Sequence, residues 1–274
     1  MLPIHRTTLA LLFFSLCLPS TLRAELILAA NFVDNGVKTW DAITRGVVNQ
    51  AISDWRQVIS GVNGTTQSIS FSVQFSNVGT SSYLGQWQGG FSASNGASVR
   101  PWSSGVNHNI FFNAAFLDAG LSNKLWFDPT PTTSNDQPQT DWDALSVARH
   151  EIGHMLGFTT LYRDNVFNPD ETNPWTSRIV NNVFDPNGLN VAMDADNSHL
   201  GTAIGNLMSP SLLNGTRLGI SNTEASMLSL AYGYDITAVP EPSSILLLCF
   251  LIPIFYRHRC RKRAAVRALA TATG

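Results

Sequence analysis

Alternation and clustering of apolar residues predict three strands in the first half of the chain. The segment Ile69 to Phe75 (ISFSVQF) alternates apolar residues with serine and glutamine, which is typical of a half-buried strand. Leu26 to Phe32 (LILAANF) and Asn109 to Phe116 (NIFFNAAF) are mostly apolar and predict two more. Between them, Gly79 to Gly105 is rich in glycine and serine, so we expect short strands joined by loops there.

Three helices are expected, and a spacing of about four residues between apolar positions predicts the first of them. The longest pattern, from Trp40 to Ile59, ends at two glycines, Gly61 and Gly64. A second helix is expected from Asp141 to Leu156, and a short third one from Asn222 to Leu230. The apolar positions of the first pattern are Trp40, Ile43, Val47, Ala51, Trp55 and Ile59.

Capping residues support the second helix. Thr140 or Asp141 can cap its start, and Asp143 adds negative charge to its first turn. Gly157 follows Leu156 and permits the left-handed turn that ends many helices. The third helix has Asn222 or Thr223 near its cap.

The order of these elements indicates the fold class. Strand, helix, strands and helix follow one another with no internal repeat, which favours an α+β fold. Asp128 to Gln139 is polar with three prolines, and Phe158 to Asn206 has weak periodicity, so both are expected to be mostly loop.

Both ends of the chain differ from the region between them. Residues 1–24 have a positive Arg6, a short apolar run and a small residue at Ala24, which predicts a secretory signal peptide. Near the other end, a Pro-Glu-Pro at 240–242 precedes an apolar stretch at 245–256 and a basic cluster. That stretch is shorter than the roughly 20 residues that cross a bilayer comfortably, and the positive charge behind it belongs on the cytoplasmic side. We therefore expect one exported domain at 25–238, a sorting segment at 239–263 and a tail at 264–274.

Charge and cysteine content narrow the function of residues 25–238. This region has nine basic and eighteen acidic residues, a net charge of −9, and no basic run. Such a surface argues against nucleic acid as a partner. All three cysteines lie outside the region, so disulfides and thiol catalysis are excluded within it.

The segment "HEIGHMLGF" on the second predicted helix carries candidate metal chemistry. His150 and His154 are four residues apart, so both imidazoles lie on one helix face and can bind one ion, for which zinc is well suited. Glu151 lies about 100° round the helix from His150. It is poorly placed as an equal ligand but well placed to accept a proton from a metal-bound water.

A catalytic zinc needs a third protein ligand, and several residues compete for that role. His199 lies downstream and His108 upstream. Thr160 is a poor ligand, because its hydroxyl would have to ionise or bind weakly. The acidic candidates are Asp164, Asp170 and Glu171.

The residues that follow His199 favour it. Asn206-Leu-Met-Ser-Pro210 resembles the Met-turn of metzincins, in which a methionine, here Met208, lies beneath the metal. Together with the histidine helix and Gly157, the chain resembles a matrixin- or leishmanolysin-like metzincin. The resemblance implies His150, His154 and His199 as zinc ligands, with the loop between Phe158 and Ser198 as an insertion.

Further features of the metzincin fold follow as expectations. The resemblance implies a mixed-sheet upper lobe, a mostly irregular lower lobe and an edge strand along the substrate cleft, for which Asn109 to Phe116 is the candidate. No tyrosine stands where some metzincins have one after the Met-turn, so neither Tyr232 nor Tyr234 is assigned a role in catalysis. Asp194 and Asp196 are candidate calcium ligands, but an acidic loop exposed to solvent is the simpler interpretation.

The segment at 239–263 resembles the PEP-CTERM sorting signal of Gram-negative bacteria. That resemblance implies transient membrane anchoring through residues 245–256, processing by an exosortase, and a location at the cell surface or outside the cell.

The hypothesis from sequence is a secreted zinc endopeptidase. In it, Glu151 acts as general base and the substrate is a protein or peptide. The alternative is a non-catalytic surface or matrix protein with a structural zinc on a zincin scaffold. A third hypothesis is a gluzincin-like peptidase with Glu171 as third ligand, which leaves Met208 unexplained.

Overall fold

The computed structural model describes residues 24–77, 83–91, 100–117, 120, 123–133, 136–159, 199–200 and 205–237. The chain separates into two compact units, Met1–Thr237 and Ala238–Gly274, and all described residues belong to the first. The predicted signal peptide up to residue 23, the sorting segment and the tail lie outside the described residues. So do Thr160, Asp164, Asp170, Glu171 and the acidic pair Asp194 and Asp196.

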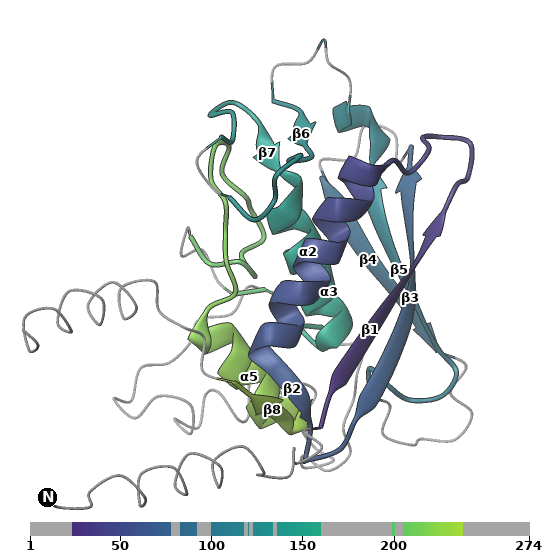
Figure 1. Ribbon diagram of the computed structural model, residues 1–274, viewed down its shortest axis with the longest axis vertical. Coiled ribbons are helices and arrows are strands. Elements are labelled where there is room, and N and C mark those ends of the chain that lie inside the picture. Colours follow the sequence, from purple (N-terminus) through teal and green to yellow (C-terminus); the bar gives the residue numbers. More distant parts are fainter. Residues whose placement is uncertain are drawn as a thin grey trace, which may run out of the picture. The chain divides into compact units, whose positions relative to one another are not determined.

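A four-stranded sheet forms one layer of the first unit (Figure 1). It consists of β1 (Leu26–Val33), β3 (Gln67–Ser76), β5 (Val106–Asn113) and β4 (Gly85–Phe91), in that spatial order. β1, β3 and β5 are parallel, and β4 pairs antiparallel with β5. The sheet is therefore mixed, and β4 is one of its two edges.

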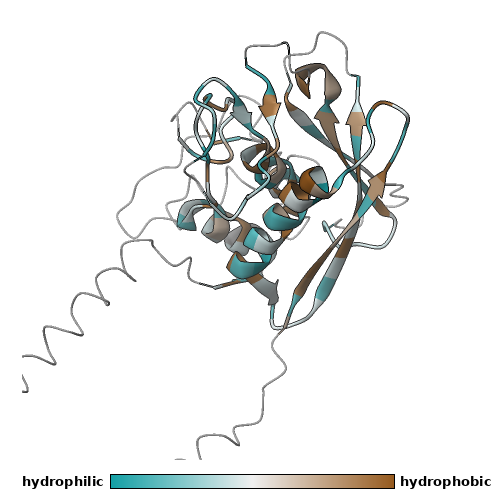
Figure 2. Ribbon diagram, turned by 45° about the horizontal axis from the view of Figure 1, so that its top comes forward, coloured by the Kyte–Doolittle hydropathy of each residue, from teal (hydrophilic) through white to brown (hydrophobic). Residues whose placement is uncertain are grey.

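Among the described residues, three helices accompany the sheet: α2 (Ala42–Val58), α3 (Ala144–Leu156) and α5 (Asn222–Tyr232). α2 and α3 pack against each other on one side of the sheet (Figure 1). Figure 2 shows hydrophobic residues concentrated along the strands and on the parts of these helices that face them. The described part of the first unit is thus a mixed α/β structure, compatible with the expected α+β class.

Short elements complete this unit. β2 (Ile59–Val62) follows α2 directly and pairs antiparallel with β8 (Tyr234–Ile236). β6 (Leu125–Trp126) pairs with β7 (Trp142–Asp143), and a 3₁₀ turn, η1 (Ala114–Leu117), follows β5. Among the described residues, no helix is long and apolar enough to span a membrane.

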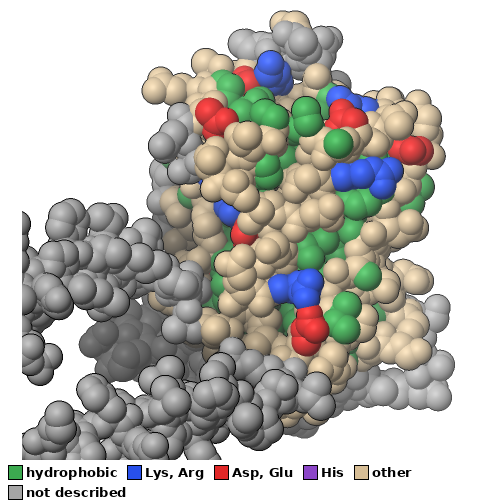
Figure 3. All heavy atoms as spheres, viewed as in Figure 1, with side chains coloured by type: hydrophobic (Ala, Val, Ile, Leu, Met, Phe, Trp, Pro, Cys, Tyr) green, Lys and Arg blue, Asp and Glu red, His purple; other side chains and the backbone are tan. Residues whose placement is uncertain are grey.

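The core lies between the helices and the sheet. Alternate residues of β3 are buried, as its pattern predicts, and an aromatic cluster closes one end of the core. In this cluster Trp40 stacks on Phe75 with ring centroids 4.2 Å apart, and Phe112 packs edge-on against Trp40. On the surface in Figure 3, acidic and basic side chains are few and lie scattered among neutral ones.

Helix starts differ from those expected. α3 is capped by Asp143, not by Thr140 or Asp141, because the Asp143 carboxylate accepts the Ser146 N–H at 3.0 Å and Trp142 is held in β7. The Asp143 carboxylate is fixed in turn by Arg217, whose guanidinium lies 2.9 Å away. Ser221, one residue before the expected cap, caps α5.

The predicted strand Asn109 to Phe116 was wrong in extent and in place. β5 starts earlier, at Val106, and Ala114 to Leu117 form a 3₁₀ turn. β5 is an inner strand, because β4 from the glycine-rich region pairs with its outer side. The edge strand on this side of the sheet is therefore β4, which lies within Gly79 to Gly105, where short strands were expected.

Trp55 connects α2 to α3 and gives a test of the core. Its side chain is fully buried, and its indole N–H donates to the Arg149 backbone carbonyl at 2.9 Å. We expect Trp55→Ala to lower the free energy of unfolding by about 3–5 kcal/mol, measured by urea denaturation. Ile43→Ala on the same helix, where the side chain is 45% exposed, should cost less than about 1 kcal/mol. Equal losses for the two variants would contradict the packing described.

Candidate metal centre

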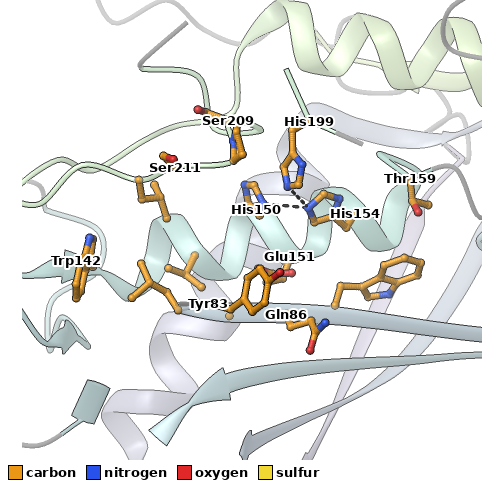
Figure 4. Close-up of a pocket in the computed structure, with 16 residues that line it drawn as sticks. Tyr83, Gln86, Trp142, His150, Glu151, His154, Thr159, His199, Ser209 and Ser211 are labelled. Carbon is orange, nitrogen blue, oxygen red and sulfur yellow. Dashed lines mark hydrogen bonds between the residues drawn. The ribbon is translucent and has the colours of Figure 1, made fainter. Parts of the chain in front are cut away.

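Three histidines from two distant parts of the chain meet at one point. His150 and His154 project from α3, and His199 comes from beyond the segment 160–198. The Nε2 atom of His154 lies 3.0 Å from Nε2 of His150 and 3.2 Å from Nε2 of His199 (Figure 4). Candidate ligand atoms of the three residues all lie within 4.8 Å of one another, which is close enough to hold a metal ion.

Backbone carbonyls orient the two helical imidazoles. His150 Nδ1 lies 2.7 Å from the Leu207 carbonyl oxygen, and His154 Nδ1 contacts the Phe158 carbonyl oxygen. A carbonyl oxygen only accepts, so each Nδ1 carries the proton and donates it. In the neutral rings each Nε2 is then unprotonated, with its lone pair directed at the common point.

Burial keeps these imidazoles neutral. Burial lowers the pKa of His150 to about 4. The pKa of His154 is well below its usual value, mainly because of burial and in addition because His150 is close by. Two unprotonated nitrogens 3 Å apart repel each other unless a cation lies between them. Nitrogen ligands at about 2.0–2.1 Å in a tetrahedron are separated by roughly 3.3 Å, close to the separations found here. The donor set therefore fits a metal ion.

Glu151 adds a carboxyl group to this centre. Its side chain is buried beside the histidines and lines the same cleft. Burial raises the pKa of this carboxyl to about 8, although the Trp87 backbone N–H, which donates to it, lowers the pKa in part. A divalent cation nearby would favour the ionised carboxylate, whereas burial favours the protonated acid. With both effects present, Glu151 can take up a proton and release it.

A backbone hydrogen bond joins the segment of Met208 to the residue after His199, next to α3. The Leu200 N–H donates to the Met208 carbonyl at 2.8 Å, which fixes the backbone next to His199. The Met208 side chain is fully buried, and a Cβ atom on Gly153 would lie 2.5 Å from its sulfur. Gly153 is thus the position where the methionine approaches the helix, one residue before His154.

A buried carboxyl group that sequence reasoning missed supports this turn. Glu224 of α5 is fully buried, and its two oxygens accept the Met208 N–H at 2.8 Å and the Ser221 N–H at 2.7 Å. Burial raises the pKa of Glu224, against the effect of these N–H donors. The same stretch of backbone provides the Leu207 carbonyl that orients His150. Glu224 thus links α5 to a candidate ligand, and its only sequence signal was the capping pair with Ser221.

A cleft of about 680 Å³ runs past the histidines between β4 and the segment after Met208. Figure 4 shows the histidines near the middle, with Trp142 toward one end and Thr159 toward the other. Gly85 brings β4 close to α3, since a Cβ there would lie 2.5 Å from Val147 Cγ1 and 3.1 Å from a Glu151 oxygen. Nothing in the residues around Gly85 singles it out, because the requirement for glycine comes from a helix about 60 residues away.

Other candidates from the sequence are placed elsewhere or lie outside the described residues. His108 is on β5, and its ring nitrogens contact Trp87 and Pro101 instead of the three-histidine cluster. Tyr232 and Tyr234 donate their hydroxyls to the Gly157 and Leu156 carbonyls, at the end of α3. The acidic alternatives Asp164, Asp170 and Glu171 fall in the segment that the structure does not describe.

The link through Glu224 predicts an effect on metal affinity. Replacing Glu224 with Ala removes the acceptor of the Met208 N–H and loosens the backbone that carries the His150 acceptor. We expect Zn²⁺ affinity to fall by about 10–100-fold, measured by calorimetric titration.

A matched variant on the same helix separates this effect from loss of the cap. Ser221→Ala removes the N-cap of α5 and keeps the contact between Glu224 and Met208, so it should cost about 1 kcal/mol of stability and leave Zn²⁺ affinity unchanged. Thermal unfolding of both variants shows whether they are folded. An equal loss of affinity in both would refute the role of Glu224 at the centre.

Comparison with known proteins assigns no family to this chain. No family model matches it, and no curated protein matches it.

Proposed function

We propose that this protein is a zinc-dependent endopeptidase. In this proposal His150, His154 and His199 hold the zinc and Glu151 is the general base. The observation that carries it is the placement of a carboxyl group and three converging imidazoles in one open cleft beside a sheet edge. A purely structural zinc needs neither the carboxyl group nor the cleft.

The ligand chemistry supports zinc as the ion. Imidazole nitrogens suit zinc, and three protein ligands leave a fourth position open for water or substrate, as in catalytic sites. Bound zinc supplies a Lewis acid and lowers the pKa of a coordinated water to about 7. No cysteine occurs between residues 25 and 238, so a thiolate site is excluded there.

Glu151 transfers the proton of the attacking water. Its carboxylate accepts a proton from the attacking water, and the protonated acid then donates this proton to the leaving amine. The buried surroundings of Glu151 favour the protonated form once it is made, and the Trp87 N–H stabilises the carboxylate. Burial and the Trp87 N–H thus act in opposite directions on the pKa of Glu151. Such a balance suits a group that must accept a proton and later donate it.

The edge of β4 provides a place for an extended peptide. One side of β4 is paired with β5, and its other side lies along the cleft. The Trp87 N–H faces α3 from that open side, because it donates to Glu151. A substrate added as a further strand would pass the three histidines with its backbone fixed by hydrogen bonds.

The resemblance to metzincins supports the same assignment. Gly157 ends α3 with a φ of +132°, Met208 lies beneath the histidines, and His199 returns to the site after a long intervening segment. We include a metzincin-like fold in the proposal, with residues 25–238 as the catalytic domain.

Export and sorting are proposed from sequence features alone. The segments at 1–24 and 239–263 support secretion in a Gram-negative bacterium, transient anchoring through residues 245–256 and processing by an exosortase. The enzyme would then cleave protein or peptide substrates at the cell surface or outside the cell.

Replacing Glu151 tests the proposed chemistry. We expect Glu151→Gln to lower kcat on fluorescence-quenched peptides by about 10²–10⁴-fold, because the amide cannot take the proton, while about one zinc per chain stays bound. Glu25→Gln, at the exposed ion pair with Arg56, is the matched control and should keep full activity. Full activity in Glu151→Gln would exclude the carboxyl as base. A wild-type protein that binds zinc and cleaves no peptide would favour the non-catalytic alternative.

A further inference from the structure

His108 holds a tryptophan at the edge of the cleft. The Trp87 indole N–H donates to His108 Nδ1 at 3.3 Å, and His108 Nε2 donates to the Pro101 carbonyl at 2.8 Å. The indole can only donate and the carbonyl can only accept. His108 must therefore be neutral, with its proton on Nε2, and burial, which lowers the pKa of His108, favours that state.

The acceptor of His108 is itself anchored to the end of α3. Arg100 and Trp102, on either side of Pro101, contact Tyr232 and Tyr234, and those tyrosines donate to the last carbonyls of α3. The indole of Trp87 is therefore positioned by the same helix that carries His150 and His154. Packing fixes this side chain although it belongs to an edge strand.

The strand geometry directs Trp87 into the cleft. Side chains two residues apart on a strand share a face, and the Cβ direction of Gly85 is toward Val147 and Glu151 of α3. Trp87 is on that face and is half-buried, and it lines the cleft together with Thr159. Trp142 lines the cleft beyond the histidines in the other direction (Figure 4).

The lining of the cleft is nearly uncharged. Apart from the three histidines and Tyr83, Glu151 is the one side chain with an ionisable group among the described lining residues. An indole face in such surroundings stacks on aromatic rings and packs on aliphatic side chains, and it offers no ion pair to a carboxylate.

We propose that Trp87 is a specificity-determining wall that contacts an aromatic or aliphatic side chain of the peptide substrate, and that His108 is the residue that positions it. This inference rests on the proposed peptidase function. It assigns a substrate class to the cleft and gives a role to a histidine that is outside the metal centre.

The test is a double-mutant cycle on the full-length protein. The probes are fluorescence-quenched octapeptides of alanine and glycine in which one Phe, Leu or Glu is moved through each position. Trp87→Phe keeps an aromatic ring and removes the indole N–H, His108→Leu removes the acceptor, and His108→Gln can both accept and donate.

The expected result is a change in KM that depends on both residues. His108→Leu should raise KM on the order of three- to ten-fold for peptides with Phe or Leu at one position, with kcat within two-fold and zinc content unchanged. His108→Gln should restore KM, and His108→Leu should add nothing in the Trp87→Phe background. Additive effects in the cycle, or a fall in kcat at constant KM, would overturn the proposal.

Binding separates this inference from the peptidase hypothesis. In the Glu151→Ala background, peptide affinity is measured by fluorescence anisotropy without cleavage. Suppose that the wild type cleaves no peptide, but that adding Trp87→Ala still lowers the affinity for the Phe peptide. The peptidase function is then wrong, and the contact between Trp87 and the peptide side chain is supported. If adding Trp87→Ala leaves the peptide affinity unchanged, Trp87 does not contact the peptide side chain and the inference is wrong.

Discussion

The structure depends on burying α3 together with its polar side chains. Nearly every residue of this helix is buried, including His150, Glu151 and His154, so each polar group needs a partner inside the protein. Leu207 and Phe158 provide carbonyls for the two imidazoles, and the Trp87 N–H reaches Glu151. The partners come from both sides of the cleft, so satisfying the helix also builds the cleft.

The N-terminal half of α3 obeys the same constraint. Ser146 Oγ accepts the Leu218 N–H at 2.7 Å, and Asp143 and Asp128 share the Arg217 guanidinium, with all three charged groups largely buried. These contacts hold the segment after Met208 along the helix. The chain from Leu207 to Leu218 therefore has a fixed course without helix or strand of its own, and it forms the wall of the cleft opposite β4.

Local patterns were enough to predict the elements whose side chains alternate or recur regularly. β1, β3, α2, α3 and α5 were all expected within a few residues. The apolar positions of β3 and α2 follow a strand and a helix period, β1 is an apolar run, and capping residues indicated α3 and α5. The helix period placed His150 and His154 on one helix face, and the resemblance of the residues around Met208 to a Met-turn implied that His199 joins them.

Features set by distant contacts could not be predicted from local pattern. β4 contains glycine and glutamine in place of an apolar alternation, and its place at the edge depends on Gly85 fitting against Val147. Asp143 caps α3 because Arg217 fixes it from 74 residues away. Glu224 was not singled out from the sequence, where its one signal is the capping pair with Ser221, and its contact with Met208 exists only in the folded chain.

The proposed chemistry depends on His199 completing a metal centre with the two helical histidines. Its most direct test is zinc content and peptide cleavage for the full-length wild type and His199→Ala side by side, with His108→Gln as the histidine control outside the cluster. The proposed function predicts about one zinc and peptide cleavage in the wild type and in the control, and loss of both in His199→Ala. Retention of zinc and activity in His199→Ala would place the third ligand at another residue and contradict the centre described.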